Sequence, residues 1–426
     1  MSDLYIKQVK GRSVWDSRGR PTVEAEVILE NGAVGRAMAP AGASTGSGEA
    51  LDRRDGGTRL GGYDVDQAVA GVNTIIAQAL AGRDAGDQQG VDACLVGLDG
   101  TGNRQNLGGN AMIATSMAVA HAAAAGSGEP LWRYLGGDDV NTLPVPEIQI
   151  FGGGAHAEGA LDLQDFMVVP FGASSFRQAM EWTAEIYLAA GKLMDTRGRR
   201  CGVADEGGYW PAFDSNEEAI SSLVQAVEDA GFVPGRDVGL SLDIAATQFY
   251  REGRYCLKKD RRTLDVGQWF DLLAGWLSNY PICMIEDPFV ESDLVSHAAL
   301  TKAYGDGVQI VGDDLLVTHV DNINACRAQR ACNTLLCKPN QVGTLSEALQ
   351  AHRAASEAGW NTVVSARSGE TEDVTIVHLA LGWGIRQLKV GSFARSERMA
   401  KWNEALRIEE MLGAAARYAG RTPFER

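Results

Sequence analysis

Six short apolar runs in the last two thirds of the chain constrain its fold most strongly. They are GLSLDIAA (239–246), ICMIEDPF (282–289), VQIVGDD (308–314), NTLLCKPN (333–340), TVVSARSG (362–369) and RQLKVGS (386–392). Helix-like segments such as EALQAHRAASEAG (347–359) lie between several of them. Apolar strands that alternate with amphipathic helices are typical of a parallel sheet buried on both faces. This many units predicts an α/β fold with a (β/α)8 TIM-like barrel. A doubly wound open sheet is the alternative, but no GxGxxG follows an early strand.

The first third of the chain has a different pattern. PTVEAEVILENG (21–32) alternates apolar and acidic residues and ends in Asn-Gly, which predicts a half-exposed strand and a hairpin turn, the beginning of a small antiparallel sheet. Segments 65–82 and 109–126 have helical spacing and end on glycine, which predicts helices packed on one face of that sheet. A chain of 426 residues exceeds what one core usually organises. We therefore expect an α+β domain over 1–137 and a barrel domain over 138–426, with the junction in the turn-rich stretch 136–149.

Charge and cysteine content exclude several classes of protein. The formal net charge of −16 argues against a nucleic-acid surface. The seven cysteines form no CxxC pair, so neither a disulfide framework nor a structural zinc site is indicated, and a reducing cytoplasm fits. MSDLYIKQVK at the N-terminus lacks a signal-peptide core, and no run reaches the roughly 18 to 20 apolar residues that a membrane span needs. We expect a cytoplasmic protein with no nucleic-acid or membrane partner.

A charged residue follows or ends each of the six apolar runs. These residues are Asp243, Glu286, Asp313, Lys338, Arg367 and Lys389. The carboxyl ends of barrel strands converge on one mouth, so side chains far apart in the sequence become neighbours there. Three carboxylates in one place would repel one another without a cation, and hard oxygen ligands select Mg²⁺. Asp243, Glu286 and Asp313 are therefore the predicted metal ligands.

The two lysines of this set suggest proton transfer. A lysine near other cations in a partly desolvated mouth has a lowered pKa, which suits Lys338 or Lys389 to act as a base. A metal-bound carboxylate makes the neighbouring carbon more acidic, because the metal stabilises the ene-diolate that forms. Proton abstraction beside a carboxylate is the predicted class of reaction.

Ten motifs in order along the chain carry a resemblance to one family. They are DSRGRPTVE (16–24), GASTG (42–46), GGGAHAEGALDLQDFM (152–167), DEGG (205–208), SLDIAA (241–246), IEDPF (285–289), GDDL (312–315), KPNQVGT (338–344), RSGETED (367–373) and KVGSFARSER (389–398). Through them the chain resembles the enolases nearly from end to end. The resemblance implies an N-terminal α+β capping domain, a barrel that begins ββαα, two Mg²⁺ ions, and a homodimer or higher homo-oligomer.

The resemblance also implies roles for individual residues. Lys338 would remove the C2 proton of the substrate, and Glu206 of DEGG would assist departure of the C3 hydroxyl from the opposite side. The first Mg²⁺ would bind Asp243, Glu286 and Asp313, and Ser44 would bind the second when its loop closes. The remaining implied contacts are Lys389 with the substrate carboxylate, Arg367 and Ser368 with the phosphate, and His156 and Gln164 with the pocket wall.

Two departures from the family pattern fall on predicted site residues. The family's SHRSGETED is SARSGETED here, so Ala366 replaces a histidine beside the phosphate and the leaving hydroxyl. The family's QEFM is QDFM here, so Asp165 is one methylene shorter than the usual glutamate near the same hydroxyl. Softer changes place Trp210, Gln248 and Pro339 in neighbouring motifs.

Three functions compete on these residues. The first in order of support is a diverged enzyme whose substrate is a phosphorylated or phosphonylated three-carbon acid with a modified phosphorus group. Enolase-like enzymes that form carboxyphosphonoenolpyruvate in phosphinothricin-type biosynthesis handle such a group. The second is an ordinary enolase that converts 2-phosphoglycerate to phosphoenolpyruvate, and the third is a non-catalytic binding protein that keeps the fold.

Overall fold

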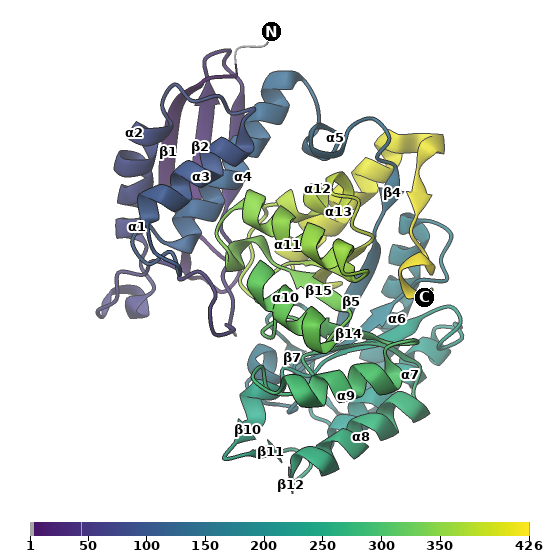
Figure 1. The fold of residues 1–426 in the computed structure, drawn as a ribbon. Coiled ribbons are helices and arrows are strands. Elements are labelled where there is room, and N and C mark those ends of the chain that lie inside the picture. The colour runs from purple at the N-terminus through teal and green to yellow at the C-terminus, as the bar shows by residue number, and fades with distance from the viewer. Residues whose placement is uncertain (1–3, 44, 426) are drawn as a thin grey trace.

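The computed structural model describes residues 4–43 and 45–425. Its N-terminal part is a three-stranded antiparallel sheet of β1 (Ile6–Trp15), β2 (Pro21–Leu29) and β3 (Val34–Met38), with β2 in the centre. Helices α1 (Asp66–Gly71), α2 (Ala77–Leu80), α3 (Gln88–Asp99) and α4 (Gly109–Ser127) gather beside this sheet, and α4 packs on β2 and β3 (Figure 1). The predicted helices are confirmed, although a π-helical stretch, Val72–Ile76, separates α1 from α2.

Two expectations for this sheet were wrong. The sheet begins one strand earlier than predicted, at β1. The strand predicted as half-exposed, β2, is almost wholly buried because it is the central strand and α4 packs on it. Its polar residues are satisfied locally: Thr22 donates to the carbonyl of Ala39, and Glu24 pairs with Arg12. The alternating polar residues of β2 therefore lie on a face where they bond to other protein groups and not to solvent.

The rest of the chain forms the predicted closed barrel, because the last strand pairs with the first. The barrel strands are β5 (Val145–Gly152), β6 (Asp165–Val169), β9 (Gly239–Asp243), β13 (Ile282–Glu286), β14 (Gln309–Gly312), β15 (Thr334–Cys337), β16 (Asn361–Ser365) and β17 (Gln387–Ser392). The helices around it are α6 (Phe176–Arg197), α7 (Asn216–Asp229), α8 (Val266–Asn279), α9 (Leu294–Tyr304), α10 (Val320–Gln329), α11 (Leu345–Glu357), α12 (Thr375–Gly382) and α13 (Ser396–Leu412).

One barrel strand runs against the others. β6 is antiparallel to both of its neighbours, β5 and β9, and two helices, α6 and α7, precede β9. This confirms the ββαα beginning that the resemblance implied. Because β6 is reversed, its first residue lies at the edge of the barrel where the other strands have their last, which decides where Asp165 lies.

Short elements complete the fold. They are α5 (Leu131–Gly136), the strands β4 (Thr142–Leu143) and β18 (Arg417–Tyr418), which pair, the hairpin β7 (Arg200–Val203) and β8 (Tyr209–Pro211), and the small sheet β10 (Tyr250–Arg251), β11 (Arg254–Leu257) and β12 (Arg262–Leu264). The stretch 136–149, expected as a junction, is irregular only before β4, since β5 already begins at Val145.

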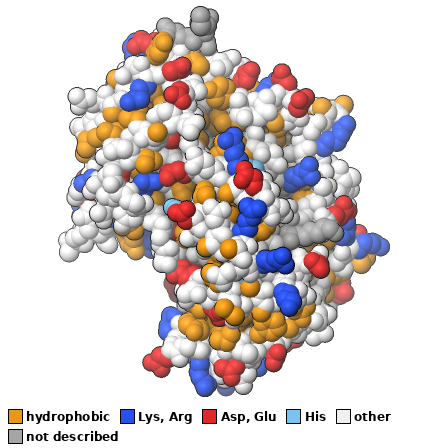
Figure 2. Space-filling view, viewed as in Figure 1, with side chains coloured by type: hydrophobic (Ala, Val, Ile, Leu, Met, Phe, Trp, Pro, Cys, Tyr) orange, Lys and Arg blue, Asp and Glu red, His pale blue; other side chains and the backbone are white. Residues whose placement is uncertain are grey.

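The surface and the helices agree with a globular protein. Acidic and basic side chains are interspersed with neutral and hydrophobic ones over the face in Figure 2. Throughout the described part of the chain, no helix combines the length and apolarity that crossing a bilayer requires.

The close packing of α4 on β3 gives a stability test. A Cβ on Gly35 would lie 2.1 Å from the nitrogen of Ala122 and 2.2 Å from the carbonyl oxygen of Ala118, both in α4. Backbone atoms of a buried helix yield little, so Gly35→Ala should cost roughly 1–3 kcal/mol or more. Thermal unfolding followed by circular dichroism would measure the loss. Gly97→Ala is the matched control, because that exposed site in α3 has open space around it, and the change should stabilise by up to about 1 kcal/mol. Equal melting temperatures for the two variants would contradict the packing described.

Candidate active site

The barrel strands bring five of the predicted residues into one buried cluster, four of them from carboxyl ends and Lys389 from within β17 (Gln387–Ser392). Asp243 and Glu286 are the last residues of β9 and β13, and the Lys389 ammonium donates to both, at 2.9 Å and 2.6 Å. Asp313 and Lys338 directly follow β14 and β15, and they form an ion pair with each other. All five side chains are buried. The mouth of the barrel therefore holds alternating acidic and basic groups.

The charge balance of this cluster corrects one expectation. Burial lowers the pKa of Lys338, but the carboxylate of Asp313 outweighs this effect and the pKa is raised above its ordinary value. Burial likewise opposes the charge of Lys389, and Asp243 and Glu286 raise its pKa well above the usual range. The prediction of a lysine with a lowered pKa counted only cations and omitted the carboxylates paired with them. With these partners, both lysines are firmly protonated.

The oxygen groups at the mouth fit a divalent cation. Oxygens of Asp287, Asp313 and Asp314 lie within 4.8 Å of one another, and Oε1 of Glu286 is buried with no hydrogen-bond partner among the described residues. Such a set of hard carboxylate donors suits Mg²⁺. The predicted trio of Asp243, Glu286 and Asp313 does not form so compact a group, because each carboxylate turns toward a lysine.

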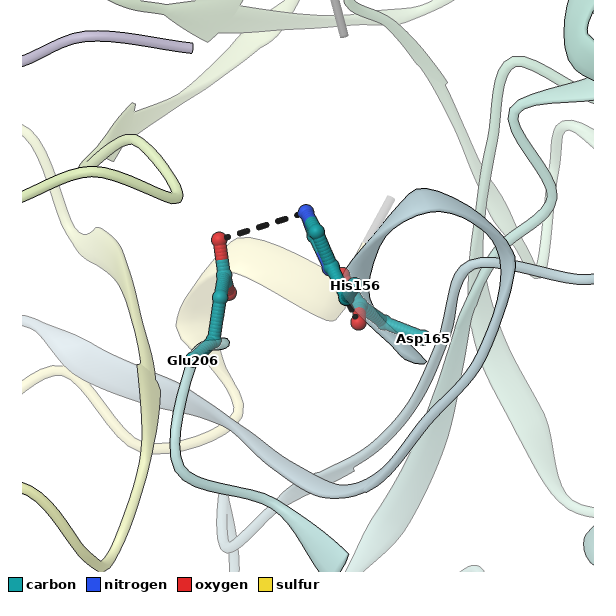
Figure 3. A group of neighbouring side chains, drawn as sticks. All are labelled: His156, Asp165 and Glu206. Atoms are coloured by element: carbon teal, nitrogen blue, oxygen red, sulfur yellow. Dashed lines mark hydrogen bonds and ion pairs between the residues drawn. The ribbon is translucent and has the colours of Figure 1, made fainter. Parts of the chain in front are cut away.

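A second cluster, of His156, Asp165 and Glu206, lies beside the first, because Asp165 of β6 is the register partner of Asp243 of β9 (Figure 3). His156 comes from a 3₁₀ turn at Gly154–Ala157, Asp165 is the first residue of β6, and Glu206 lies in the loop between β7 and β8. Nδ1 of His156 is 2.8 Å from Oδ1 of Asp165, and Nε2 is 3.6 Å from Oε1 of Glu206. The imidazole therefore separates the two carboxylates.

Asp165 lies on the side of the His156 ring that faces away from Glu206. Its Oδ1 also accepts a hydrogen bond from Gln149 of β5, while its Oδ2 is buried with no hydrogen-bond partner among the described residues. In the register of the reversed strand, Asp165 pairs with Gly152 and with Asp243. The carboxylate of Asp165 thus contacts Nδ1 of His156, and Nε2 of the same ring is the nitrogen that faces Glu206.

The protonation of His156 follows from this arrangement. Burial opposes its charge, but the carboxylates of Asp165 and Glu206 outweigh burial and raise the pKa of His156 to about 9. His156 is therefore an imidazolium at neutral pH, and the cluster carries one positive charge between two negative ones.

The predicted anion-binding residues are in contact with a loop of the N-terminal part. Arg367 donates to both carboxylate oxygens of Glu49, at 2.9 Å and 3.2 Å, and to Asn340 at 3.2 Å. Oγ of Ser368 accepts from the backbone nitrogen of Ala43 at 2.6 Å. Ser44, the predicted second metal ligand, lies outside the described residues. The Arg367 guanidinium, which was predicted to bind an anion, is therefore paired with a carboxylate of the chain itself, that of Glu49.

The remaining predicted residues have different surroundings. Gln164 donates to Asp243 at 3.0 Å and accepts from Gln248. Ala366 lies between β16 and Arg367; its backbone nitrogen donates to the carbonyl of Lys389 at 2.9 Å, and its methyl group is buried. Trp210 lies in β8, with Gly202 of β7 as its register partner.

Several residues of the site were missed by sequence reasoning. Asp287, Asp314 and Gln341 lie inside motifs that were recognised, so a signal for them was present. Glu49 follows the GASTG motif closely but carries no motif of its own. Arg398 of α13 is fully buried and donates to the carbonyls of Arg367 and Ser368, which fixes the loop after β16. Glu147 and Gln149 lie in a strand whose first residues gave no catalytic signal.

Comparison with protein families gives one consistent result. Residues 6–135 match the family model described as Enolase, N-terminal domain, and residues 140–426 match the one described as Enolase, C-terminal TIM barrel domain. The two matches together account for nearly all of the chain.

The raised pKa of His156 gives a test of the second cluster. The unfolded value is about 6.5 and the folded value about 9, so the charge of His156 stabilises the fold fully below pH 6.5 and loses this effect as pH rises through 9. Among the six histidines, His156 should be the ring that titrates near pH 9 by NMR. Asp165→Asn should lower that midpoint, because it removes the charge nearest to Nδ1. A midpoint near 6.5 in the unaltered protein would show that the carboxylates do not hold the imidazolium.

Proposed function

The chain belongs to the enolase family, and from this we propose that it is a magnesium-dependent lyase that removes the C2 proton of a 2-phosphoglycerate-like acid carrying a modified phosphorus group. Family membership makes it an enolase-superfamily enzyme with a small phosphorylated acid as its substrate. The modified group is the finer part of the proposal. It is supported by Ala366, a buried methyl directly before Arg367, where the family pattern has an imidazole. Formation of carboxyphosphonoenolpyruvate is the kind of reaction that this difference fits.

The acidic side of the mouth supplies the metal ligands in this proposal. Asp243, Glu286 and Asp313 would hold one Mg²⁺, and Ser44 would join a second. When bound, the metal would stabilise the negative charge that develops on the substrate carboxylate as the C2 proton leaves. The unpartnered Oε1 of Glu286 and the oxygen cluster around Asp313 support this assignment.

Lys338 is the proposed base. It keeps its proton while Asp313 is its partner, and it loses that support once Asp313 is engaged elsewhere. Its backbone is fixed, because its backbone nitrogen donates to Thr318 at 2.9 Å and Pro339 follows it. Lys389 remains an ammonium and binds the carboxylate of the substrate in this proposal.

Glu206 is the proposed acid on the other side. It precedes β8, which pairs with β5, whereas Lys338 follows β15, and these barrel strands are not neighbours. Base and acid can therefore act on two faces of one bound molecule. The His156 imidazolium, whose Nε2 is 3.6 Å from Oε1 of Glu206, would stabilise the carboxylate that Glu206 becomes when it gives its proton to the departing hydroxyl.

Arg367 and Ser368 are the proposed seat of the phosphorus group. The group would replace Glu49 at the guanidinium, since both are anions that accept two N–H bonds. Arg398 donates to the carbonyls of Arg367 and Ser368, so the backbone that carries the guanidinium would keep its position when the partner of Arg367 changes. Ordinary dehydration of 2-phosphoglycerate is the second candidate, because Lys338, Glu206 and the three carboxylates are all present.

Restoring the family residues separates these two candidates. Ala366→His together with Asp165→Glu should raise turnover of 2-phosphoglycerate by about 100-fold or more, since one proton-transfer group contributes typically 10²–10⁴-fold. Steady-state formation of phosphoenolpyruvate with Mg²⁺, followed by its ultraviolet absorbance, measures the change. The two single variants show which site limits the rate. If the unaltered protein already turns over this substrate at about 10 s⁻¹, an ordinary rate for an enzyme, the modified-substrate proposal is wrong.

The role of Lys338 can be tested without knowing the final product. Lys338→Ala should reduce exchange of the C2 proton of 2-phosphoglycerate in deuterated buffer by about 100-fold or more, while Mg²⁺-dependent binding stays measurable. Proton NMR follows the exchange and calorimetry follows the binding. Lys338→Arg keeps the partner of Asp313 and checks that the fold survives, and Lys302→Ala, an exposed lysine of α9, is the control for charge. Exchange that persists in Lys338→Ala assigns the base to another residue.

A further inference from the structure

Glu147 is a buried carboxylate that none of the roles above uses. It lies in the middle of β5 with 2% of its surface exposed. Its Oε1 accepts a hydrogen bond from Ser241 of β9, two strands away, so both side chains point into the barrel. Its Oε2 is buried with no hydrogen-bond partner among the described residues. An ionisable group in this position needs a physical reason, because the interior of a barrel is normally filled by branched apolar side chains.

The surroundings of Glu147 are charged only on one side, because the buried polar side chains in the layer of Val145 and Met284, Gln309 and Gln387, are uncharged and hydrogen-bond to each other. Below it, Val145 belongs to an apolar cluster with Val169, Met284, Val311, Leu336 and Val363. Met284 is the register partner of Ser241, so an apolar side chain is well accommodated in the same layer. Above it, the strand continues to Gln149, which contacts Asp165. Glu147 is thus the carboxylate at the boundary between the apolar interior and the charged mouth.

Lys389 is the nearest cation by strand register. Lys389 and Glu147 are directly paired residues of β17 and β5, so their side chains lie next to each other on the same face. Burial raises the pKa of Glu147, and the charge of Lys389 is the strongest of the effects that oppose this rise. The Lys389 ammonium itself donates upward, to Asp243 and Glu286.

Next to Lys389 there is therefore one acceptor that no described residue uses, Oε2 of Glu147. Asp243 and Glu286 are the residues to which the proposed function assigns a metal ion, and a metal ion and an ammonium compete for the same oxygens. A buried ammonium that lost both partners would strongly destabilise the folded state if nothing replaced them. The unpartnered oxygen of Glu147 can replace them from below.

We propose that Glu147 is a positioning residue that accepts the Lys389 ammonium while Asp243 and Glu286 bind the metal ion. The proposal rests on the function proposed above. It makes Glu147 the counter-charge that allows Lys389 to remain a cation at the mouth, where an anionic substrate carboxylate would meet it. When the metal ion binds, the Lys389 ammonium would exchange Asp243 and Glu286 for Glu147. No buried charge would then be left without a partner.

Binding of Mg²⁺ alone to the full chain tests this directly. Glu147→Gln keeps an acceptor for Ser241 but removes the charge, and it should weaken Mg²⁺ binding by about 10- to 100-fold, as loss of a group supporting metal ligands commonly does. Glu147→Met should weaken it by a similar factor. Titration calorimetry measures the affinity, and thermal unfolding in EDTA measures the metal-free fold. The metal-free Glu147→Met protein should melt at or above the temperature of the unaltered protein, because it no longer buries a carboxylate.

The controls separate this role from a structural one. Met284→Leu alters the same interior layer without altering charge, and Glu129→Gln removes an exposed charge far from the mouth; neither should change Mg²⁺ affinity. If the Glu147 variants bind Mg²⁺ as tightly as the unaltered protein, the inference is wrong whatever their stability. If Glu147→Met does not fold, the Glu147→Gln result decides alone. If the unaltered protein does not bind Mg²⁺, the proposed function fails first and the inference with it.

Discussion

The pairing of buried carboxylates with two lysines is the interaction on which the mouth of this barrel depends. Asp243, Glu286 and Asp313 come from three strand ends, and without compensation their mutual repulsion and desolvation would oppose closure of the sheet. Lys389 compensates two of them and Lys338 the third. The same oxygens suit a divalent cation, so the lysines act as the internal counter-ions of the proposed metal site. This pairing raises the pKa values of both lysines, and these raised values apply to the protein without a bound metal ion.

The mouth is also the place where the two parts of the chain meet. Glu49 reaches from the N-terminal part to Arg367, the nitrogen of Ala43 donates to Ser368, and the nitrogen of Met38 donates to Asp373 at 2.9 Å. On the barrel side, Arg398 holds the backbone of the same loop from beneath. The proposed anion site is therefore held by Arg398 on one side and closed by the carboxylate of Glu49 on the other. An incoming anion would compete with Glu49, which couples its binding to the contact between the two parts.

The sequence predicted those features that depend on a local pattern. Short apolar runs identified the six later barrel strands, and the charge after each run identified most of the mouth, because parallel strands necessarily bring their ends together. The features it missed depend on partners that a linear pattern does not contain. β2 alternates like an exposed strand, yet Arg12 and Ala39 bury its polar face. The lysine pKa values are raised by carboxylates from other strands. The proposed role of Glu147 could not be predicted from its local sequence, which resembles any buried strand. It depends on the register that pairs Glu147 with Lys389.

The two departures from the family pattern remove bulk from the mouth while leaving its charge balanced. Asp165, with its shorter side chain, remains hydrogen-bonded to His156 and Gln149, so its negative charge still holds the imidazolium, and only its reach into the mouth is reduced. Ala366 removes a side chain beside Arg367, whose own charge is matched by Glu49. Loss of function would not need to preserve these compensations, because a mouth that no longer bound metal or anion would gain stability by replacing its buried charges with apolar groups. In the proposed function, the charged partners bind the metal ion and the substrate, and the smaller side chains at these two positions would make room for a modified phosphorus group.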